Sequence, residues 1–416
     1  MFCPSPESEL PVAEGREKTV VFDRTSSPEL DSILTEILHK VILPAHLPSQ
    51  KQRLISLERN RQRLAVDPVI VEVDGYEHKF EVLDFKHGHV PKTSPLVRKA
   101  FRLMKTREDW ANLGRLLSGL ALAKRRFRRQ EFQLLVQEAG RTRNMYAVLD
   151  ALTRNKYSGL EVTTLNSADN VLHQLAAMAW ESGYAYKETK KASSWASRFL
   201  EIVATSKHAS FSREPQVIGQ ALHLAASEAL FHHGGKDTEE RVVDHAKTLI
   251  EEWAFKTEKV EKPSDGRPLG LLDLHSSKEE VIESGTARLI AHSKALWYLH
   301  LDPSRHITIL CYLIKGIEWA SQVVPQLAGS LKPIREGCEY ELQIHVENRD
   351  GTDVDFKGKK LPCKMGWAVY DALMVEGERP VNWGPSKEEV EAEFAEEVKG
   401  QHDEKAEAQR KGEEDI

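Results

Sequence analysis

Cysteine and long apolar runs are both scarce in this chain of 416 residues. The four cysteines are too few and too scattered for a disulfide scaffold or a thiolate zinc site. No apolar run approaches the roughly 18–20 residues that a membrane-spanning helix needs. These absences exclude an integral membrane protein and a disulfide-rich secreted domain. The chain is 40% hydrophobic, enough for a sizeable core, so we expect a soluble protein of a reducing compartment.

Motifs for catalysis and metal binding are also missing. The histidine pairs at His87 and at His232 have no nearby cysteine and no His-x-x-x-His spacing with an adjacent acid. The latter pair precedes two glycines, as at a helix C-terminus. The segment 234–238 faintly resembles a phosphate-binding loop, but Leu230 stands where that motif needs glycine and Asp237 where it needs serine or threonine. We therefore expect no enzyme, cofactor or metal.

Helical periodicity dominates the chain from residue 95 to about residue 346. Many mid-length segments joined by short loops predict an all-α fold, an α-solenoid-like array of helical hairpins. Paired segments repeat at about 35 residues, near the tetratricopeptide length, yet neither the tetratricopeptide nor the ankyrin pattern occurs in full. The predicted helices are Ser94–Thr106, Asp109–Ala123, Phe127–Gly140, Met145–Asn155, Ser167–Ser182, Lys187–Thr205, Pro215–Phe231, Asp237–Phe255, Lys278–Leu301 and a stretch from Ser304 onward.

The two ends of the chain differ from this array. A helical pattern opens at Pro28, and two β-rich runs joined by Asp74-Gly75 predict a hairpin with a type I′ turn. Residues 386–416 hold twelve acids and five bases, which predicts a disordered acidic tail. The predicted divisions are a disordered N-terminus at 1–27, N-terminal helices and the β-hairpin at 28–93, the helical array at 94–346 with a loop at 256–268, a loop and short helix at 347–385, and the acidic tail at 386–416.

The strongest functional signal is electrostatic. Between Lys86 and Arg143 fifteen bases face four acids, a net charge of +11 in a chain whose total is −6. A basic patch on a helical array favours contact with a phosphate backbone. There are three alternatives. The basic face is solvated, it binds the chain's own acidic tail, or it binds an acidic patch of another protein. The candidate RNA or partner contacts are Arg98, Lys99, Arg102, Lys105, Lys124, Arg125, Arg126, Phe127, Arg128, Arg129, Arg141 and Arg143.

Aromatic residues near this basic segment divide by role. Trp110 lies on an apolar stripe with Leu113 and Leu117, so we expect it to pack in the core rather than stack on a base. Phe127 is flanked by bases on both sides, and its sequence context does not decide between core packing and stacking on a base.

Several segments carry a family resemblance that spans residues 66–330. They are VIVEVDGYEHKFEVLDF from residue 69, PLVRKAFRLM from 95, REDWANL from 107 and EPQVIGQALHLAA from 214. In this layout the chain resembles fungal helical-array proteins of the mitochondrial ribosome, in its large subunit. The resemblance implies a nucleus-encoded, imported and non-catalytic structural protein of the matrix, with ribosomal RNA and neighbouring ribosomal proteins as partners. The N-terminus has neither a secretory signal nor a typical transit peptide, so a cytoplasmic location is the alternative.

Other functions remain open on sequence grounds. One is a pentatricopeptide-like RNA-binding factor in mitochondrial translation or RNA processing, although regular repeats are too few for a code of one base per repeat. Another is a tetratricopeptide-like scaffold that binds peptides. A hydrolase ranks last.

Overall fold

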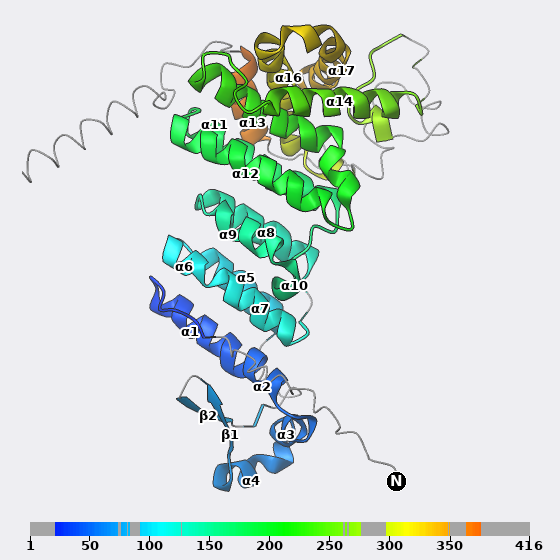
Figure 1. Ribbon diagram of the computed structural model, residues 1–416. Coiled ribbons are helices and arrows are strands. Elements are labelled where there is room, and N and C mark those ends of the chain that lie inside the picture. The colour runs from blue at the N-terminus through cyan, green and yellow to red at the C-terminus, as the bar shows by residue number, and fades with distance from the viewer. Residues whose placement is uncertain are drawn as a thin grey trace, which may run out of the picture. The chain divides into compact units, whose positions relative to one another are not determined.

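The computed structural model describes residues 21–73, 76–80, 82–83, 92–125, 127–260, 263, 266–275, 297–347, 349 and 363–375 (Figure 1). The chain divides into two compact units, each with its own contacts. Unit 1 comprises residues 1–126 with 157–159, and unit 2 comprises residues 127–156 with 160–416. Apart from one two-stranded sheet, the regular elements of the described residues are helices, so the all-α prediction is confirmed.

Unit 1 combines short helices with the predicted hairpin. α1 begins at Pro28, a position where the missing N–H costs nothing, and its apolar face packs against α5. Strands β1 and β2 pair antiparallel with Val69 opposite Phe80 and Val73 opposite Tyr76, which confirms the hairpin, while Asp74 and Gly75 lie outside the described residues. The elements are α1 (Pro28–Ile37), η1 (Leu38–Ile42), α2 (Leu43–His46), α3 (Ser49–Ile55), η2 (Glu58–Asn60), α4 (Arg61–Val66), β1 (Val69–Val73), β2 (Tyr76–Phe80), α5 (Thr93–Leu103), α6 (Arg107–Ala111) and α7 (Leu113–Leu122).

A buried carboxylate holds the start of this unit together. Asp109 accepts hydrogen bonds from the backbone N–H groups of Ser26, Lys105 and Thr106 at 2.8–2.9 Å. Burial disfavours the charged carboxylate, but these hydrogen bonds outweigh it and lower the pKa of Asp109. The buried Asn112 makes two hydrogen bonds to the backbone of Asp23, 89 residues earlier. Its amide oxygen accepts the N–H of Asp23, and its amide nitrogen donates to the carbonyl of Asp23. The helix predicted from residue 109 to 123 is therefore wrong, because it breaks at Asn112 into α6 and α7.

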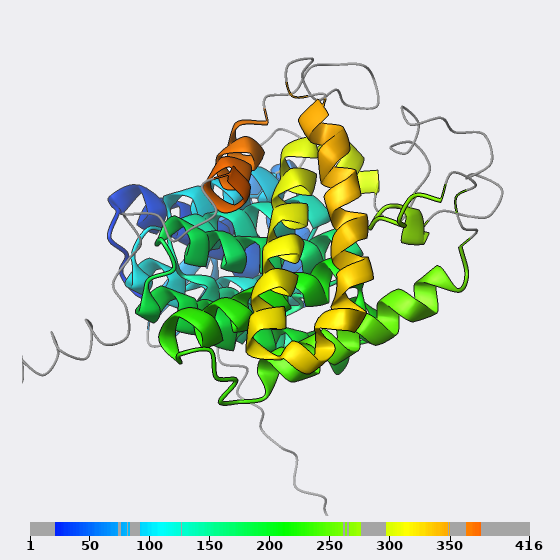
Figure 2. The ribbon, with the colours of Figure 1, turned by 90° about the horizontal axis from the view of Figure 1, so that it is seen from above.

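Unit 2 holds the longer helices. Figure 1 shows α11 and α12 beside each other, and Figure 2 shows α16 and α17 as an antiparallel pair. The elements are α8 (Arg129–Arg141), α9 (Met145–Thr153), α10 (Asn155–Ser158, whose last two residues group with unit 1), α11 (Leu165–Glu181), α12 (Tyr186–Ala204), η3 (Ala209–Arg213), α13 (Pro215–His232), α14 (Arg241–Thr257), η4 (Asp273–His275), α15 (Trp297–Leu301), α16 (Pro303–Val323), η6 (Pro325–Leu327), α17 (Ala328–Glu347), α18 (Lys364–Tyr370) and η7 (Asp371–Val375).

α13 is the central helix of unit 2 and is buried along nearly its whole length. It contacts α11, α12, α14 and α16. Its contact with α16 is close because each helix offers a glycine to the other. A Cβ at Gly219 would lie 2.7 Å from Cγ of Leu313, and one at Gly316 would lie 2.8 Å from Cα of His223. Small residues therefore set the distance between these two helices.

A further predicted helix begins at another residue than the observed one, and one lies largely outside the described residues. α14 begins at Arg241 instead of residue 237, because the Asp237 carboxylate accepts the N–H of Val243 at 2.9 Å and lies before the helix. Of the helix predicted from 278 to 301, only Trp297–Leu301 falls within the described residues. The acidic tail at 386–416 and most of the N-terminal segment at 1–27 also lie outside them. No described helix combines the length and apolar character needed to cross a membrane.

We expect Gly316→Ala to destabilise unit 2. The new methyl group would meet the backbone of His223, which cannot swing aside, so overpacking should cost about 1–3 kcal/mol. Urea unfolding measures the change. Gly329→Ala in α17 is the control, since no atom lies within 4 Å of its Cβ position and alanine favours a helix. Equal stability of the two variants would contradict the close contact of α13 with α16.

Candidate functional site

The twelve predicted contact residues, eleven bases and Phe127, divide between the two units. Seven lie in unit 1: Arg98, Lys99 and Arg102 on α5, Lys105 after it, and Lys124, Arg125 and Arg126 after α7. Arg126 is outside the described residues. The other five belong to unit 2, with Phe127 and Arg128 before α8, Arg129 and Arg141 at its two ends, and Arg143 beyond it. The basic segment is continuous in sequence, but its residues belong to both units.

Some of these cations are already neutralised. Lys99 forms an ion pair with Glu29 at 2.7 Å, and the guanidinium of Arg141 donates to Glu138 at 2.9 Å. Arg98 is half-buried and donates to the carbonyl of Ser94. Lys99 and Arg141 therefore have less charge to offer a partner, whereas Arg98 keeps its charge because a carbonyl is neutral.

The remaining cations are exposed. Within the described part of the chain no ion pair joins them to an acid, so their charge faces solvent. They are Arg102, Lys105, Lys124, Arg125, Arg128, Arg129 and Arg143. Phe127 is half-buried, and Trp110 is 1% exposed, which confirms its predicted place in the core.

Two of the exposed cations occupy left-handed backbone positions at helix ends. Lys124 has φ 52° after α7, and Arg143 has φ 57° after α8. At each, the N–H of the next residue donates to the carbonyl five residues before it, at 2.9 and 2.8 Å, a Schellman-type helix end that favours glycine. The side chain makes this conformation cost about 1–2 kcal/mol. A cation there is favourable for the helix dipole and projects charge from the helix end.

The unit 2 cations do not form one cluster. α8 has 13 residues, so its ends are about 20 Å apart at 1.5 Å per residue. Arg128 and Arg129 are at its beginning, where the Glu131 carboxylate accepts the N–H of Arg128 at 2.6 Å. Arg141 and Arg143 are at its other end. A ligand that touches both ends of α8 would have to span about 20 Å.

A pocket that the sequence did not reveal lies in unit 2. It has a volume of about 400 Å³ and is lined by residues of unit 2 from 152–156, 160–162 and 202–208. Lys156, Lys207 and His208 line it. No motif marks these residues, because they belong to stretches of ordinary composition that meet only when α9 and α12 pack together.

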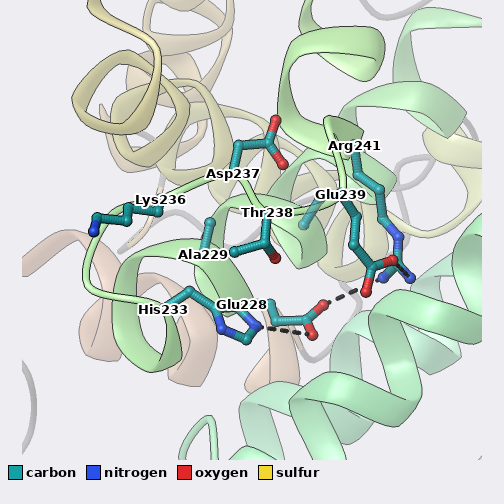
Figure 3. Close-up of a pocket in the computed structure, with 9 residues that line it drawn as sticks. Glu228, Ala229, His233, Lys236, Asp237, Thr238, Glu239 and Arg241 are labelled. Carbon is teal, nitrogen blue, oxygen red and sulfur yellow. Dashed lines mark hydrogen bonds and ion pairs between the residues drawn. The ribbon is translucent and has the colours of Figure 1, made fainter.

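The phosphate-loop-like segment forms no anion site. α13 ends at His232, and Gly234 and Gly235 take positive φ, as a helix C-terminus requires. Figure 3 shows the residues that line the pocket beside them. This pocket holds only about 20 Å³, about one water molecule. Glu228 lies within it, 3.5 Å from His233 and 3.4 Å from Arg241. Its carboxylate would repel a phosphate.

Metal binding has no support among the described residues, where no group of three or more histidine, cysteine or acidic side chains could hold an ion. His232 makes a hydrogen bond of 2.9 Å to the carbonyl oxygen of Tyr184. His87 and His89 are outside the described residues.

Several buried ionisable groups join helices instead. Asp169 of α11 is fully buried, pairs with Arg305 of α16 at 2.8 Å and accepts from Gln220 of α13 at 2.6 Å. Burial raises the pKa of Asp169, while Arg305 opposes that change. His223 donates to or accepts from the hydroxyl of Tyr184 at 2.9 Å, and burial lowers its pKa to about 3. His223 is therefore neutral within the core.

A second buried network joins α16 to α17. Glu341 accepts the N–H of Leu272 at 2.6 Å and lies 3.3 Å from His306, whose other ring nitrogen is 3.1 Å from His345. Burial raises the pKa of Glu341 to about 8, helped by Asp273 and opposed by the Leu272 N–H, His345 and Arg267. These groups lie in the core and line neither pocket described above.

Comparison with known proteins decides the family. The sequence profile described as "Mitochondrial ribosomal protein mS27" matches residues 8–372. This chain belongs to the mS27 family of mitochondrial ribosomal proteins. It is also 26% identical to the small ribosomal subunit protein mS27 of Neurospora crassa, over 74% of this chain and 78% of the relative.

Membership in the mS27 family confirms the expected fungal mitochondrial ribosomal protein and its structural, non-catalytic role. The chain is therefore a mitochondrial ribosomal component, with ribosomal RNA and ribosomal proteins as its class of partner. The expectation of the large subunit is wrong, since the relative is named as a protein of the small subunit. The segments that carried the resemblance reflect helix packing, which contains no information on the subunit.

The Glu341 network predicts a pH dependence. The folded pKa of about 8 lies above the unfolded value of about 4.5, so its stabilisation is complete below pH 4.5 and is lost as the pH rises through 8. Between pH 6.5 and 8 we expect the free energy of unfolding to fall by about 1.5 kcal/mol, and Glu341→Gln to remove this fall.

Urea unfolding at several pH values measures this loss. Glu336→Gln is the matched control, because Glu336 lies on the same helix but is 48% exposed beside Lys332. Parallel stability curves for the wild type and Glu341→Gln would show that Glu341 is ionised throughout this range.

Proposed function

We propose that this chain is a structural component of the small subunit of the mitochondrial ribosome, in the matrix. The family match over residues 8–372 carries the proposal, and the name of the Neurospora crassa relative supports the choice of subunit. The helices supply a rigid framework, and exposed cations at their ends bind ribosomal RNA or acidic segments of neighbouring proteins.

In this proposal each unit docks through its own cations. Lys105, Lys124 and Arg125 serve unit 1, and Arg128, Arg129 and Arg143 serve unit 2. Arginine and lysine at helix ends bind phosphate oxygens and release counterions, so the contact depends strongly on salt. The cations that already have intramolecular partners, Lys99 and Arg141 among them, are expected to contribute less.

Sedimentation tests the assignment to a subunit. After a gentle organelle lysis, we expect the native protein to migrate with the small ribosomal particle in a sucrose gradient at low and at high salt. Ribonuclease should release it if RNA is its main contact. Migration with the large particle, or as a free protein at both salts, would contradict the proposal.

Glycine substitutions separate stability from docking. Lys124→Gly and Arg143→Gly relieve the left-handed backbone, so we expect equal or higher stability, by up to about 1 kcal/mol. Each should also remove one phosphate contact, lowering the salt slope of RNA binding by about 0.7–0.9. Urea unfolding and a salt titration of ribosomal RNA binding measure the two effects.

Glu240→Gly is the matched control. Glu240 is exposed and has φ 58°, so the same backbone relief accompanies loss of a negative charge. Its RNA affinity should stay equal or rise. If all three variants change RNA affinity alike, backbone strain rather than charge governs binding.

A further inference from the structure

The pocket of about 400 Å³ in unit 2 has an apolar part, a polar part and nearby cations, as ligand sites do. Its size lies within the range of about 300–1,000 Å³ that is usual for small-molecule sites. Apolar side chains form one part of the lining: Leu152, Leu160, Val162, Ile202 and Val203. Leu152, Leu160, Val162 and Val203 are at most 5% exposed, so this part belongs to the core and does not need to rearrange.

Polar side chains form another part of the lining. Asn155 is exposed, and within the described residues its amide has no hydrogen-bond partner. Thr153 donates to the carbonyl of Leu149 at 2.8 Å and accepts from Arg198. Ser206 accepts the backbone N–H of His208 at 3.1 Å, which fixes the turn after α12. An amide that both donates and accepts is suited to the edge of a nucleobase.

Cations outnumber acids around the pocket. Lys156 is exposed and forms no ion pair with the described residues. Lys207 is 83% exposed and only 3.9 Å from Glu161, at the limit of an ion pair. Glu161 is the one acid in the lining. The two lysines therefore keep charge available for a phosphate.

An aromatic ring, that of His208, completes the lining. The ring of His208 lies parallel to that of Phe211, with an interplanar angle of 4° and centroids 5.2 Å apart. His208 lines the pocket and Phe211 does not, so Phe211 supports the histidine ring from outside. A supported flat ring is the surface on which unpaired bases stack.

We propose that this pocket binds one unpaired nucleotide of a single-stranded RNA segment. The base enters over the apolar lining and stacks on His208, Asn155 binds its edge, and Lys156 and Lys207 bind the flanking phosphates. This inference rests on the proposed function, since it names an RNA contact within it. A peptide would not need paired cations next to a flat ring, and duplex RNA would not release a base.

The test uses the full chain with a fluorescein-labelled single-stranded RNA of about 12 nucleotides and mixed sequence, and the same strand in a duplex. Fluorescence anisotropy should show tighter binding of the single strand. His208→Ala should weaken it about tenfold, and His208→Phe should restore it, because the flat ring returns. Thermal melting checks that each variant is folded.

The lysines are tested through salt. Lys156→Ala with Lys207→Ala should lower the salt slope for single-stranded RNA by about 1.4, the value for two lost phosphate contacts. Lys247→Ala with Lys332→Ala is the matched control, because both lysines are exposed on other helices, α14 and α17. This control should leave the slope within about 0.3 of the wild type.

Three outcomes would overturn the proposal. In the first, His208→Ala and the double lysine variant bind single-stranded RNA like the wild type. In the second, the duplex binds as tightly as the single strand. In the third, RNA binding is unchanged but the variants no longer sediment with the small ribosomal particle, which would show that a protein segment occupies the pocket. Failure of the wild type to sediment with that particle would instead contradict the proposed function.

Discussion

The close contact of α13 with α16 is the constraint on which unit 2 depends. Gly219 and Gly316 let the two helices approach until the Cβ position at Gly316 lies 2.8 Å from the backbone of His223. At this distance no water separates the helices, so polar groups between them need partners from the protein. Arg305 and Gln220 supply these for Asp169, which joins α11 to both helices. Removing either Asp169 or Arg305 would leave the charge of the other buried and uncompensated. The helix spacing and this ion pair therefore depend on each other.

This rigid interior explains where the chain can place its charges. Because helices such as α13 are buried on most of their surface, mainly the helix ends and the connecting loops are free to contact a partner. Lys124 and Arg143 occupy left-handed positions where glycine would be more stable, so the sequence retains charge at a cost in stability. The structure gains no ion pair from either among its described residues, which leaves an external anion as the compensation that fits the proposed function.

Local sequence predicted much of the architecture and missed what depends on distant contacts. The hairpin, the central helix from Pro215 and the core position of Trp110 follow from periodicity and turn chemistry over a few residues. The break at Asn112 depends on Asp23, 89 residues away. The basic segment is continuous in sequence but divides at residue 126 and along the length of α8. The pocket at His208 joins two segments that no local pattern connects.

Net charge restricts how an acidic protein approaches RNA. The segment 86–143 carries +11 and the whole chain −6, so the other residues together carry −17. An acidic surface repels a phosphate backbone, but at physiological salt this repulsion fades over about 8 Å. α8 alone is about 20 Å long, so an RNA strand at one helix end is screened from acids one helix length away. Cations confined to helix ends and to the His208 pocket can therefore bind RNA while the acidic remainder faces solvent or protein, which limits the RNA contact to these edges.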